Sequence, residues 1–388
     1  MEYREHRGLT LSEVGVGCYA LAGAYGPVHP QEFIAMLRRA ADLGVTFFDT
    51  AGNYGDAETV LGEAVRPFRD EVLLATKVGS PEGAPPRLDP EAVAASCRRS
   101  LERLGTDHID LLQVHFDDPS TPVEDTVAAL GALRDEGLIR HYGVGHLPAA
   151  RVARYLAVGD PFSILMELSA VARDSRRTLL PRCGGGGPAA IAFSVTGRGL
   201  LSGAIGPRTT FAPGDIRNFD PLFQRARLAS GLRIAGRFGD LSRSLGRTPA
   251  QAAIAWALAQ PGVECALTGP RRVAHLEENL AGSGFRLPAA ELADLESLFA
   301  AEDAALAAEE GATVDVILDG PLPADSTAAF RDLVYAIETA VGLGRVAEDD
   351  VRPAFFELWP LQEALDGAGP ALDRVRERLR AVVPRGRP

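Results

Sequence analysis

Residues 109–144 of this chain read IDLLQVHFDDPSTPVEDTVAALGALRDEGLIRHYGV, and this stretch decides the fold. Its first part, Ile109–His115, is an apolar run with the length of a buried strand. Val123–Asp135 has apolar residues at helical spacing and is followed by Gly137, a favoured residue just beyond a helix end. Ile139–Val144 is a second apolar run. The stretch therefore predicts a strand, a helix and a strand in succession, which is the repeating unit of α/β proteins.

The same alternation of apolar runs and helical patterns extends along the chain in both directions. Six further strands are predicted at residues 14–17, 45–49, 72–77, 162–168, 189–194 and 263–267. Helices are predicted at residues 31–42, 57–66, from Asp89 onward, 222–245, 249–260, 273–280 and 289–298. Eight strands alternating with helices over about 300 residues predict an α/β protein built as a (β/α)8, or TIM, barrel. A doubly wound sheet is the alternative, and it is less favoured because no G-x-G-x-x-G follows the first strand.

A second region is expected to begin near Ala304, where the alternation of strands and helices stops. Residues 305–310 are rich in alanine and glutamate, and Asp325 or Ser326 is a suitable N-cap for a later helix. The apolar residues of that helix fall on one face: Phe330, Leu333, Val334, Ile337 and Val341. A further helix is expected at residues 370–383.

We therefore expect a barrel over residues 1–303 and a mainly helical C-terminal extension over residues 304–388. The apolar face of the helix in the extension has to be covered by the barrel, by a second copy of the chain or by another protein. A homo-oligomer formed through the extension is accordingly one expectation.

Composition limits the classes of partner. The net charge is −12 and the isoelectric point about 5.2, which argues against nucleic acids and anionic membranes as main partners. The sequence has neither a transmembrane-length apolar run nor the apolar core of a secretory signal. The four cysteines are widely spaced, so no metal motif is expected. These features favour a cytoplasmic protein with free thiols that acts on a small molecule.

Lys77 is the only lysine among the 40 lysine and arginine residues of the chain. Arginine cannot replace lysine where a compact ammonium with an adjustable pKa is needed, because guanidinium stays protonated above about pH 12. Lys77 also ends a predicted strand, and in a TIM barrel the carboxyl ends of the strands build the active site. Lys77 is therefore a candidate active-site residue, and the alternative is that one lysine survived by chance.

Three other polar residues fall at neighbouring strand ends. Asp49 and His115 end predicted strands, and Tyr54 lies in the loop after Asp49. Taken singly, each has an ordinary explanation as a helix cap, a surface turn residue or a buried histidine. Their joint placement beside Lys77 instead indicates a single site.

These four side chains suit the reduction of a carbonyl group. A free tyrosine has a pKa of about 10, and a nearby ammonium is expected to lower it. Asp49 would hold the ammonium of Lys77, and His115 would donate a hydrogen bond to the carbonyl oxygen. Tyr54 would protonate that oxygen while a hydride reaches the carbonyl carbon.

The motifs around these residues resemble those of the aldo-keto reductase superfamily, in its bacterial and potassium-channel-β-subunit-like branch. They are FDTAGNYG at residues 48–55, ATK at 75–77 and LLQVH at 111–115, and the resemblance spans about residues 5–300. It implies a (β/α)8 barrel that binds NAD(P)H without a Rossmann fold. It also implies that Tyr54 is the general acid/base, that Lys77 tunes it, and that Asp49 holds Lys77. His115 would orient the carbonyl.

The resemblance implies a cofactor site after the strand at 263–267. Five residues there are similar to the adenosine site of the family: Gly269, Arg271, His275, Glu278 and Asn279. Arginines in a turn before a helix also form an anion site on physical grounds, and a solvated basic turn is the alternative. The guanidinium of Arg271 suits a 2′-phosphate, so NADP(H) is expected, with NAD(H) as the alternative.

Other strand ends are implied to contact the same cofactor. Five residues resemble the loop that wraps the pyrophosphate: Ser194, Thr196, Gly197, Gly199 and Leu200. Gly17, Cys18 and Tyr19 match the segment beside the nicotinamide ribose. Gly145 and His146 stand where the family has Ser-Asn, and Met166 takes the place of a glutamine that meets the nicotinamide. These departures concern how the nicotinamide ring is oriented.

Two other functions were compatible with the sequence. A Schiff-base aldolase would use Lys77, although an ammonium paired with Asp49 is a poor nucleophile. A non-catalytic NADP(H)-binding regulatory or partner-binding subunit would account for the altered nicotinamide contacts and the helical extension. The leading expectation is an NADPH-dependent aldehyde or ketone reductase, with Tyr19, Tyr25, Phe116 and Phe219 as candidates for lining an apolar substrate pocket.

Overall fold

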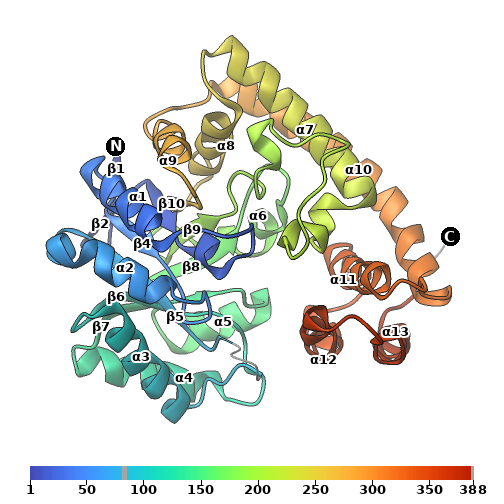
Figure 1. The fold of residues 1–388 in the computed structure, drawn as a ribbon, viewed down its shortest axis with the longest axis horizontal. Coiled ribbons are helices and arrows are strands. Elements are labelled where there is room, and N and C mark those ends of the chain that lie inside the picture. The colour runs from blue at the N-terminus through green and yellow to red at the C-terminus, as the bar shows by residue number, and fades with distance from the viewer. Residues whose placement is uncertain (81–84, 386–388) are drawn as a thin grey trace. The chain divides into compact units, whose positions relative to one another are not determined.

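The computed structural model describes residues 1–80 and 85–385, and these residues form two compact units. The first, which we call the barrel unit, comprises Met1–Ile205 and Arg237–Ala289. The second, which we call the helical unit, comprises Gly206–Gly236 and Ala290–Pro388. Figure 1 shows the elements of both units in chain order by colour.

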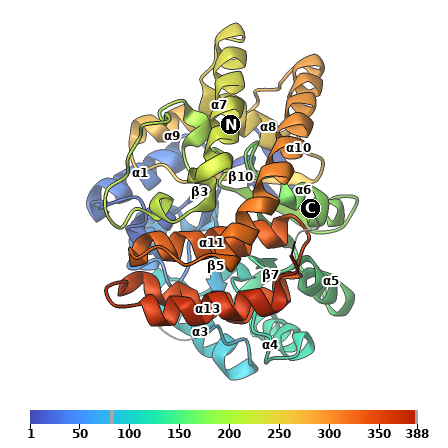
Figure 2. The same ribbon diagram turned by 90° about the vertical axis from the view of Figure 1, so that its right-hand side faces the viewer.

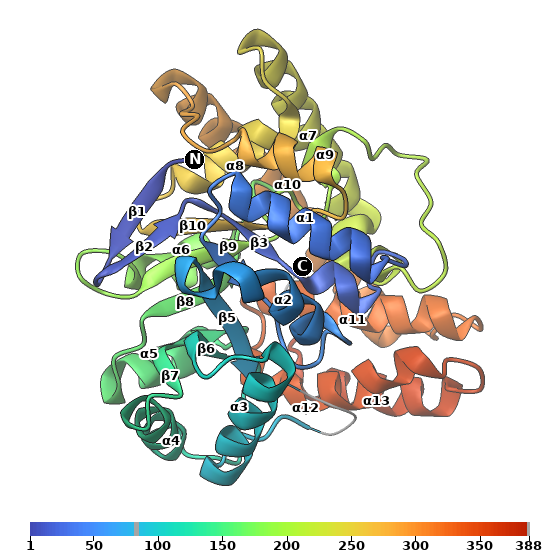
Figure 3. The ribbon, with the colours of Figure 1, turned by 60° about the vertical axis from the view of Figure 1, so that its left-hand side comes forward.

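Eight strands of the barrel unit close into one parallel barrel. Neighbouring strands follow the order of the chain, and the last pairs with the first (Figure 3). They are β3 (Val14–Gly17), β4 (Phe47–Asp49), β5 (Leu73–Val78), β6 (Ile109–Val114), β7 (Ile139–Gly145), β8 (Ser163–Glu167), β9 (Ala189–Phe193) and β10 (Val263–Thr268). This confirms the predicted (β/α)8 barrel, because a doubly wound sheet would have two open edges.

Helices follow the strands, as the alternating pattern predicted, although the helices at residues 149–158 and 174–178 were not among those predicted. They are α1 (Pro30–Asp42), α2 (Ala57–Val65), α3 (Pro90–Leu104), α4 (Val123–Asp135), α5 (Ala149–Val158), α6 (Asp174–Thr178), α8 (Pro249–Leu258) and α9 (Val273–Leu280). Local capping explains where two of them begin. Asp89 accepts a hydrogen bond from the backbone of Ala92 (3.1 Å), and Thr248 forms a capping box with Gln251.

A two-stranded hairpin before the barrel was not predicted from the sequence. It consists of β1 (Tyr3–His6) and β2 (Leu9–Ser12), which pair antiparallel. Its turn residues Arg7 and Gly8 both have positive φ angles, 46° and 81°, as a tight two-residue hairpin turn requires. Arginine is not a typical residue for that backbone region, so the sequence carried no clear turn signal.

The barrel interior is filled by side chains that alternate along each strand. The buried interior cluster contains Phe47, Ala75, Leu111, Phe162, Leu165, Ala189, Ile191, Cys265 and Leu267. Gly15 has to be glycine, because a Cβ there would lie 2.9 Å from Leu267 and 3.0 Å from Phe47. Since side chains alternate, residues two positions further along each strand also point inward, at its carboxyl end. That rule places Asp49 and Lys77 on the inner side.

The helical unit has its own core. Its helices are α10 (Ala289–Asp319), α11 (Ser326–Gly342), α12 (Glu348–Leu358) and α13 (Gly369–Val382), together with the first part of α7 (Arg225–Ser244), which continues into the barrel unit. Figure 2 shows α11 and α13 running side by side. The apolar face predicted for α11 is buried in one cluster with residues of α12 and α13, including Leu358, Leu372 and Leu379. Other helices of the same unit therefore cover that face, and it gives no reason to expect a second copy of the chain.

The expected boundary after residue 303 lies inside α10, which is one continuous helix. The alanine- and glutamate-rich residues 305–310 are strong helix formers, so they extend the helix that begins at Ala289. The helical unit also contains residues 206–236, which lie earlier in the chain. Helix α12 was not predicted.

A buried ion pair links residues 206–236 to the other helices of the helical unit. Arg227 Nε donates to Glu310 Oε1 (2.6 Å), and the Tyr335 hydroxyl donates to the same oxygen (3.1 Å). Arg227 Nη2 also donates to Thr339 Oγ1 (3.0 Å). Because Glu310 is buried, these bonds are shielded from water.

Replacing Glu310 with alanine is expected to lower the free energy of unfolding by about 1.5–3 kcal/mol, because the partly buried Arg227 would lose its shorter ion pair and keep only the contact with Glu338 (3.9 Å). Urea unfolding followed by circular dichroism measures this loss. The matched control is Glu309→Ala on the exposed side of the same helix, which should change stability by less than about 0.5 kcal/mol. Equal effects of the two substitutions would contradict a stabilising role for the pair.

No helix among the described residues is long and apolar enough to cross a membrane. Within the same residues, no group of three or more His, Cys, Asp or Glu side chains is arranged to hold a metal ion.

Candidate active site

The structure brings Asp49 and Lys77 into direct contact at the carboxyl ends of β4 and β5. Lys77 Nζ donates to Asp49 Oδ1 (2.6 Å) and to the backbone oxygen of Thr50 (2.7 Å). Gln113 of β6 donates from Nε2 to the other oxygen of Asp49 (3.0 Å). Lys77 retains only 1% of its accessible surface, so this charge is held at a fixed position inside the protein.

Tyr54 and His115 lie beside this pair. The Tyr54 hydroxyl is 3.5 Å from His115 Nε2, and Lys77 Nζ lies 5.0 Å from the centroid of the Tyr54 ring. The other nitrogen of His115, Nδ1, is 2.7 Å from the hydroxyl oxygen of Ser80. All four polar residues predicted at neighbouring strand ends are therefore found together.

Two supporting residues, Gln113 and Ser80, were not predicted from the sequence. Gln113 stands two positions before His115, so strand alternation could have placed it on the inner side with Asp49. Ser80 lies in the loop after β5, and no spacing rule links that loop to His115.

Burial sets the protonation states of the two groups that would face a substrate. Burial raises the pKa of the Tyr54 phenol well above its ordinary value, and the negative charge of Asp49 raises it further. The pKa of His115 is lowered well below its ordinary value by burial and then by the positive charge of Lys77. At neutral pH the site thus contains a neutral phenol next to a neutral imidazole.

The direction of the Tyr54 shift is opposite to the sequence expectation that Lys77 lowers this pKa. The physical reason is that the ammonium of Lys77 is already paired with Asp49 at 2.6 Å. Asp49 offsets part of the charge of the ammonium, so the attraction that remains between Lys77 and a phenolate is smaller than the penalty that burial imposes on the phenolate.

Met166 was expected to take the place of a nicotinamide contact, and its orientation does not agree with that expectation. Leu165 belongs to the interior cluster of the barrel, so Met166, the next residue on β8, points to the opposite side of the strand. Glu167 points inward at the end of β8. It pairs with Arg198 through two hydrogen bonds of 2.5 and 3.2 Å.

The loop after β9 contains the predicted pyrophosphate contacts Ser194, Thr196, Gly197, Gly199 and Leu200. Ser194, Gly197 and Gly199 have positive φ angles of 54°, 59° and 92°, so the backbone follows a tightly turned path. A Cβ on Gly197 would lie 2.5 Å from Val171, so only glycine fits there. The backbone N–H groups of Gly197, Gly199 and Leu200 donate to carbonyl oxygens of the same loop, which fixes the path of its backbone.

Gly17 ends β3, and Cys18 and Tyr19 follow it next to Asp49 and Tyr54. Cys18 is fully buried and donates its backbone N–H to the backbone oxygen of Asp49 (2.8 Å). The ring of Tyr19 is 38% exposed and lies 4.9 Å from the ring of Tyr54. This segment therefore forms one wall beside Tyr54.

Gly145 is the last residue of β7, and His146 follows it. A Cβ on Gly145 would lie 3.1 Å from the side chain of Leu165, which leaves little room for the serine of related chains. His146 has a left-handed backbone, with φ of 48°. Its ring lies 5.3 Å from that of His115 and is stacked on that of Phe193, at 4.8 Å. His146 thus contributes an aromatic ring rather than an amide.

The predicted adenosine contacts lie at the end of β10 and on α9. Gly269 is exposed, and a Cβ there would meet nothing within 4 Å. Arg272 precedes α9 without capping it by its side chain, so the first N–H groups of the helix remain available to an anion. Arg271 and His275 are exposed around this helix start, and Arg271 donates to the backbone oxygen of Tyr25. These residues fit a phosphorylated ligand, with Glu278 and Asn279 partly buried in the last turn of α9.

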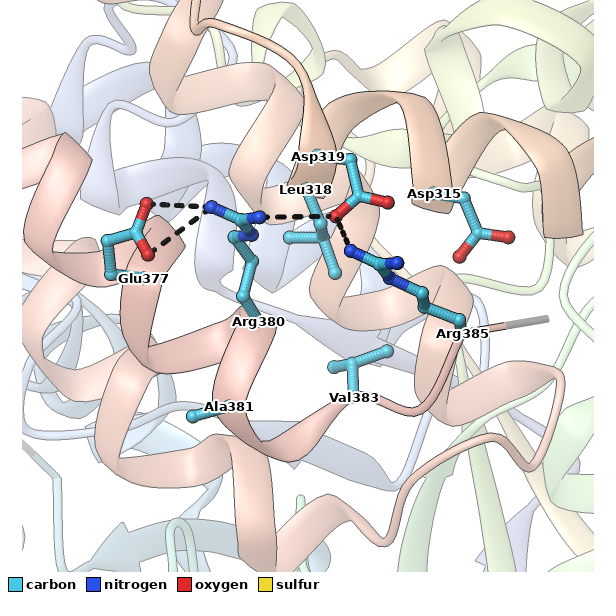
Figure 4. Close-up of a pocket in the computed structure, with 8 residues that line it drawn as sticks. All are labelled: Asp315, Leu318, Asp319, Glu377, Arg380, Ala381, Val383 and Arg385. Atoms are coloured by element: carbon cyan, nitrogen blue, oxygen red, sulfur yellow. Dashed lines mark hydrogen bonds and ion pairs between the residues drawn. The ribbon is translucent and has the colours of Figure 1, made fainter.

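A surface hollow in the helical unit contains none of the residues predicted for chemistry. It has a volume of about 370 Å³ and is lined by Asp315, Leu318, Asp319, Glu377, Arg380, Ala381, Val383 and Arg385. Figure 4 shows Asp319 meeting both Arg380 and Arg385, and Arg380 also meeting Glu377. The remaining carboxylate of the hollow, Asp315, pairs with Arg345. These charges therefore already have partners within the protein.

The fold and the residues at its strand ends define a class of enzyme, a TIM-barrel oxidoreductase acting on carbonyl groups. The aldo/keto reductase family model matches residues 13–300, and the chain belongs to that family.

Two curated relatives resemble the chain over most of their own length. It is 33% identical to the aldo-keto reductase str7 of Strobilurus tenacellus over 324 residues, covering 80% of this chain and 95% of the relative. It is 31% identical to the aldo-keto reductase YhdN of Bacillus subtilis (strain 168) over 310 residues, covering 77% and 93%. Among solved structures, the glycerol dehydrogenase AKR11B4 of Gluconobacter oxydans has a TM-score of 0.71 and 26% identity, covering 77% of this chain and 95% of that one.

Proposed function

We propose that this enzyme reduces an aldehyde or ketone to an alcohol, or catalyses the reverse reaction, with NADP(H) as cofactor and Tyr54 as general acid/base. The observation that carries the proposal is the arrangement around Tyr54. Its hydroxyl is 3.5 Å from His115 Nε2 and lies next to the buried pair of Lys77 and Asp49. We further propose that residues up to about 303 carry the chemistry and that the extension plays no direct part in it.

Each of these residues has a defined task in the reduction. The nicotinamide, when bound, supplies the hydride to the carbonyl carbon. Tyr54 gives its proton to the carbonyl oxygen as negative charge develops there, and His115 holds that oxygen by donating from Nε2. The Ser80 hydroxyl next to His115 Nδ1 can donate to that nitrogen, which fixes the tautomer with the proton on Nε2.

Lys77 acts on the same step through its charge and position. The two hydrogen bonds that it makes to Asp49 and Thr50 leave it oriented next to the Tyr54 ring. When Tyr54 has released its proton, the ammonium stabilises the resulting phenolate at close range. Asp49 in turn is held by Gln113, so we assign Asp49 and Gln113 as positioning residues.

The cofactor would lie across the strand ends that carry the predicted contacts. The turned loop after β9 would hold its pyrophosphate, and the start of α9 with Arg271 would hold its 2′-phosphate. Gly17, Cys18 and Tyr19 would lie beside the nicotinamide ribose, with Gly145 and His146 near the ring. An exposed arginine at a helix start favours NADPH over NADH, because a 2′-phosphate gives that guanidinium a partner.

Stopped-flow mixing of the enzyme, NADPH and 4-nitrobenzaldehyde tests the proposed function. The expected result is a decrease in NADPH absorbance with stoichiometric formation of the alcohol, and slower turnover with NADH. NADPH that binds without being oxidised by any member of a carbonyl panel would instead support a cofactor-binding subunit. A product trapped on Lys77 by borohydride would support an aldolase, which is disfavoured because Lys77 already donates to two oxygens.

The two directions of the reaction are expected to respond differently to pH. Because the pKa of Tyr54 is raised and that of His115 is lowered, neither group titrates near neutrality. Reduction needs the neutral phenol, so its kcat should be nearly flat between about pH 6 and pH 8. Alcohol oxidation needs the phenolate, so its kcat should rise by up to about tenfold per pH unit over this range. Parallel profiles for both directions would contradict the assignment of Tyr54.

A further inference from the structure

Aromatic side chains form a continuous series of contacts at the carboxyl end of the barrel, and we call them the aromatic arc. Its members are Tyr19, Tyr25, Tyr54, His115, Phe116, His146 and Phe193. All of them belong to the barrel unit. Tyr54 and His115 are buried, whereas Tyr19 and His146 are exposed and the other members are partly exposed. The arc therefore places partly accessible aromatic residues next to the two groups that would hold a carbonyl oxygen.

His146 is the centre of one side of this arc. Its ring lies 5.3 Å from that of His115 and 5.4 Å from that of Phe116. On its other side it stacks on Phe193 with an interplanar angle of 26° and a centroid distance of 4.8 Å. Contact with Phe193 holds the imidazole in place, so its ring is ordered before any ligand arrives.

The charges near this side of the arc are already paired. Lys77 is bound to Asp49, and Arg198 is bound to Glu167 by two hydrogen bonds. The pKa of His146 is lowered to about 4, first because the protein atoms packed around it disfavour its charged form and then because of the positive charges of Lys77 and Arg198, so His146 is neutral at neutral pH. An anionic group placed against these rings would exchange its water shell for an uncharged surface, which is unfavourable.

We propose that His146 is a specificity-determining residue, whose ring makes the enzyme prefer uncharged aryl carbonyl compounds over saturated and anionic ones. A planar aryl group next to the reacting carbonyl can stack on the imidazole and meet the edge of Phe116. A saturated ring of similar size gains only the hydrophobic free energy of the surface that it buries, without the added attraction between aromatic rings. The inference rests on the proposed carbonyl reduction and adds the class of substrate.

The left-handed backbone of His146 determines which substitutions can test the proposed role of its ring. Asparagine adopts positive φ readily and has no aromatic ring, so His146→Asn removes the ring with little strain. His146→Phe keeps a ring at the same place. The matched control is His141→Asn on the same strand, because His141 lies near the opposite end of β7, 4.8 Å from Phe162.

The measured quantity is the ratio of kcat/KM for 4-nitrobenzaldehyde to that for cyclohexanecarboxaldehyde. His146→Asn is expected to lower this ratio by about three- to tenfold, the range that one aromatic contact provides, while His146→Phe restores most of it. His141→Asn should leave the ratio unchanged. Both aldehydes react with the same bound cofactor, so a general loss of NADPH binding changes both kcat/KM values together and leaves their ratio unchanged. A fluorescence titration with NADPH measures that loss separately.

A second comparison needs no variant. Wild-type enzyme should reduce methyl 4-formylbenzoate with at least about tenfold higher kcat/KM than 4-formylbenzoate, because Lys77 and Arg198 already hold carboxylates and the substrate carboxylate would lose its water shell without gaining either as a partner. The intrinsic reactivity of the two aldehydes is corrected for by dividing by the ratio of their rates with borohydride in the same buffer. Equal values for ester and acid, or an aryl preference that survives His146→Asn, would overturn the inference and leave carbonyl reduction intact. If no aldehyde oxidises bound NADPH, the proposed function fails and the inference fails with it.

Discussion

Replacing Tyr54 with phenylalanine is expected to lower kcat for carbonyl reduction by about 10²- to 10⁴-fold, the range for loss of a positioned general acid. The substitution removes the hydroxyl that lies 3.5 Å from His115 and keeps the ring between Tyr19 and Lys77. The packing that shapes the site should therefore persist, and NADPH should still bind. Single-turnover stopped-flow measurement of hydride transfer separates this chemical loss from changes in binding or product release.

The matched control for this prediction is Tyr3→Phe. Tyr3 lies in the hairpin before the barrel, is 48% exposed, and donates its hydroxyl to the backbone oxygen of Gly44. Removing that hydroxyl should leave turnover close to wild type. If Tyr54→Phe retained more than about a tenth of the wild-type rate, another group would have to supply the proton, and His115 would be the first candidate.

The barrel could be predicted because both of its signals are local. Apolar runs such as Ile109–His115 predict strands, and residues such as Asp89 and Thr248 mark helix starts. A barrel then places every strand end on one face, so Asp49, Lys77 and His115 could be grouped without coordinates. Tyr54 followed because it lies in the short loop after Asp49.

What the sequence did not reveal depends on contacts between distant residues. Whether Leu165 or Met166 points inward depends on how β8 is set against its neighbours, and a shift of one residue reverses the answer. The contact of Arg227 with Glu310 spans 83 residues, so no local pattern could place residues 206–236 with the helices that follow the barrel. Short elements such as the first hairpin have too few residues for a periodic pattern.

The pKa of Tyr54 shows a different limit. The sequence placed an ammonium near the phenol and from that alone predicted a lower pKa. The structure adds that the phenol is buried and that the negative charge of Asp49 offsets part of the charge of the ammonium, and both raise the pKa of Tyr54. The site is thus prepared to donate a proton, and Lys77 acts after the proton has left.

Replacing Lys77 with methionine is expected to affect both activity and stability, and the two effects can be separated. Methionine has a similar length and no charge, so the phenolate of Tyr54 would lose its stabilising ammonium, and kcat should fall by about 10²-fold or more. Asp49, which accepts from Lys77 at 2.6 Å, would be left buried without a counter-charge. The free energy of unfolding at neutral pH should fall by about 3–5 kcal/mol, as it does when one partner of a buried pair is removed.

The double variant Asp49→Asn/Lys77→Met distinguishes the two effects. Asparagine removes the unpaired charge and can still accept the hydrogen bond from Gln113, so most of the lost stability should return. Activity should not return, because the ammonium is still missing. Urea unfolding and single-turnover kinetics on the three variants measure both quantities. Recovery of activity together with stability would show that Lys77 serves only to hold the fold, and that the phenol of Tyr54 acts without it.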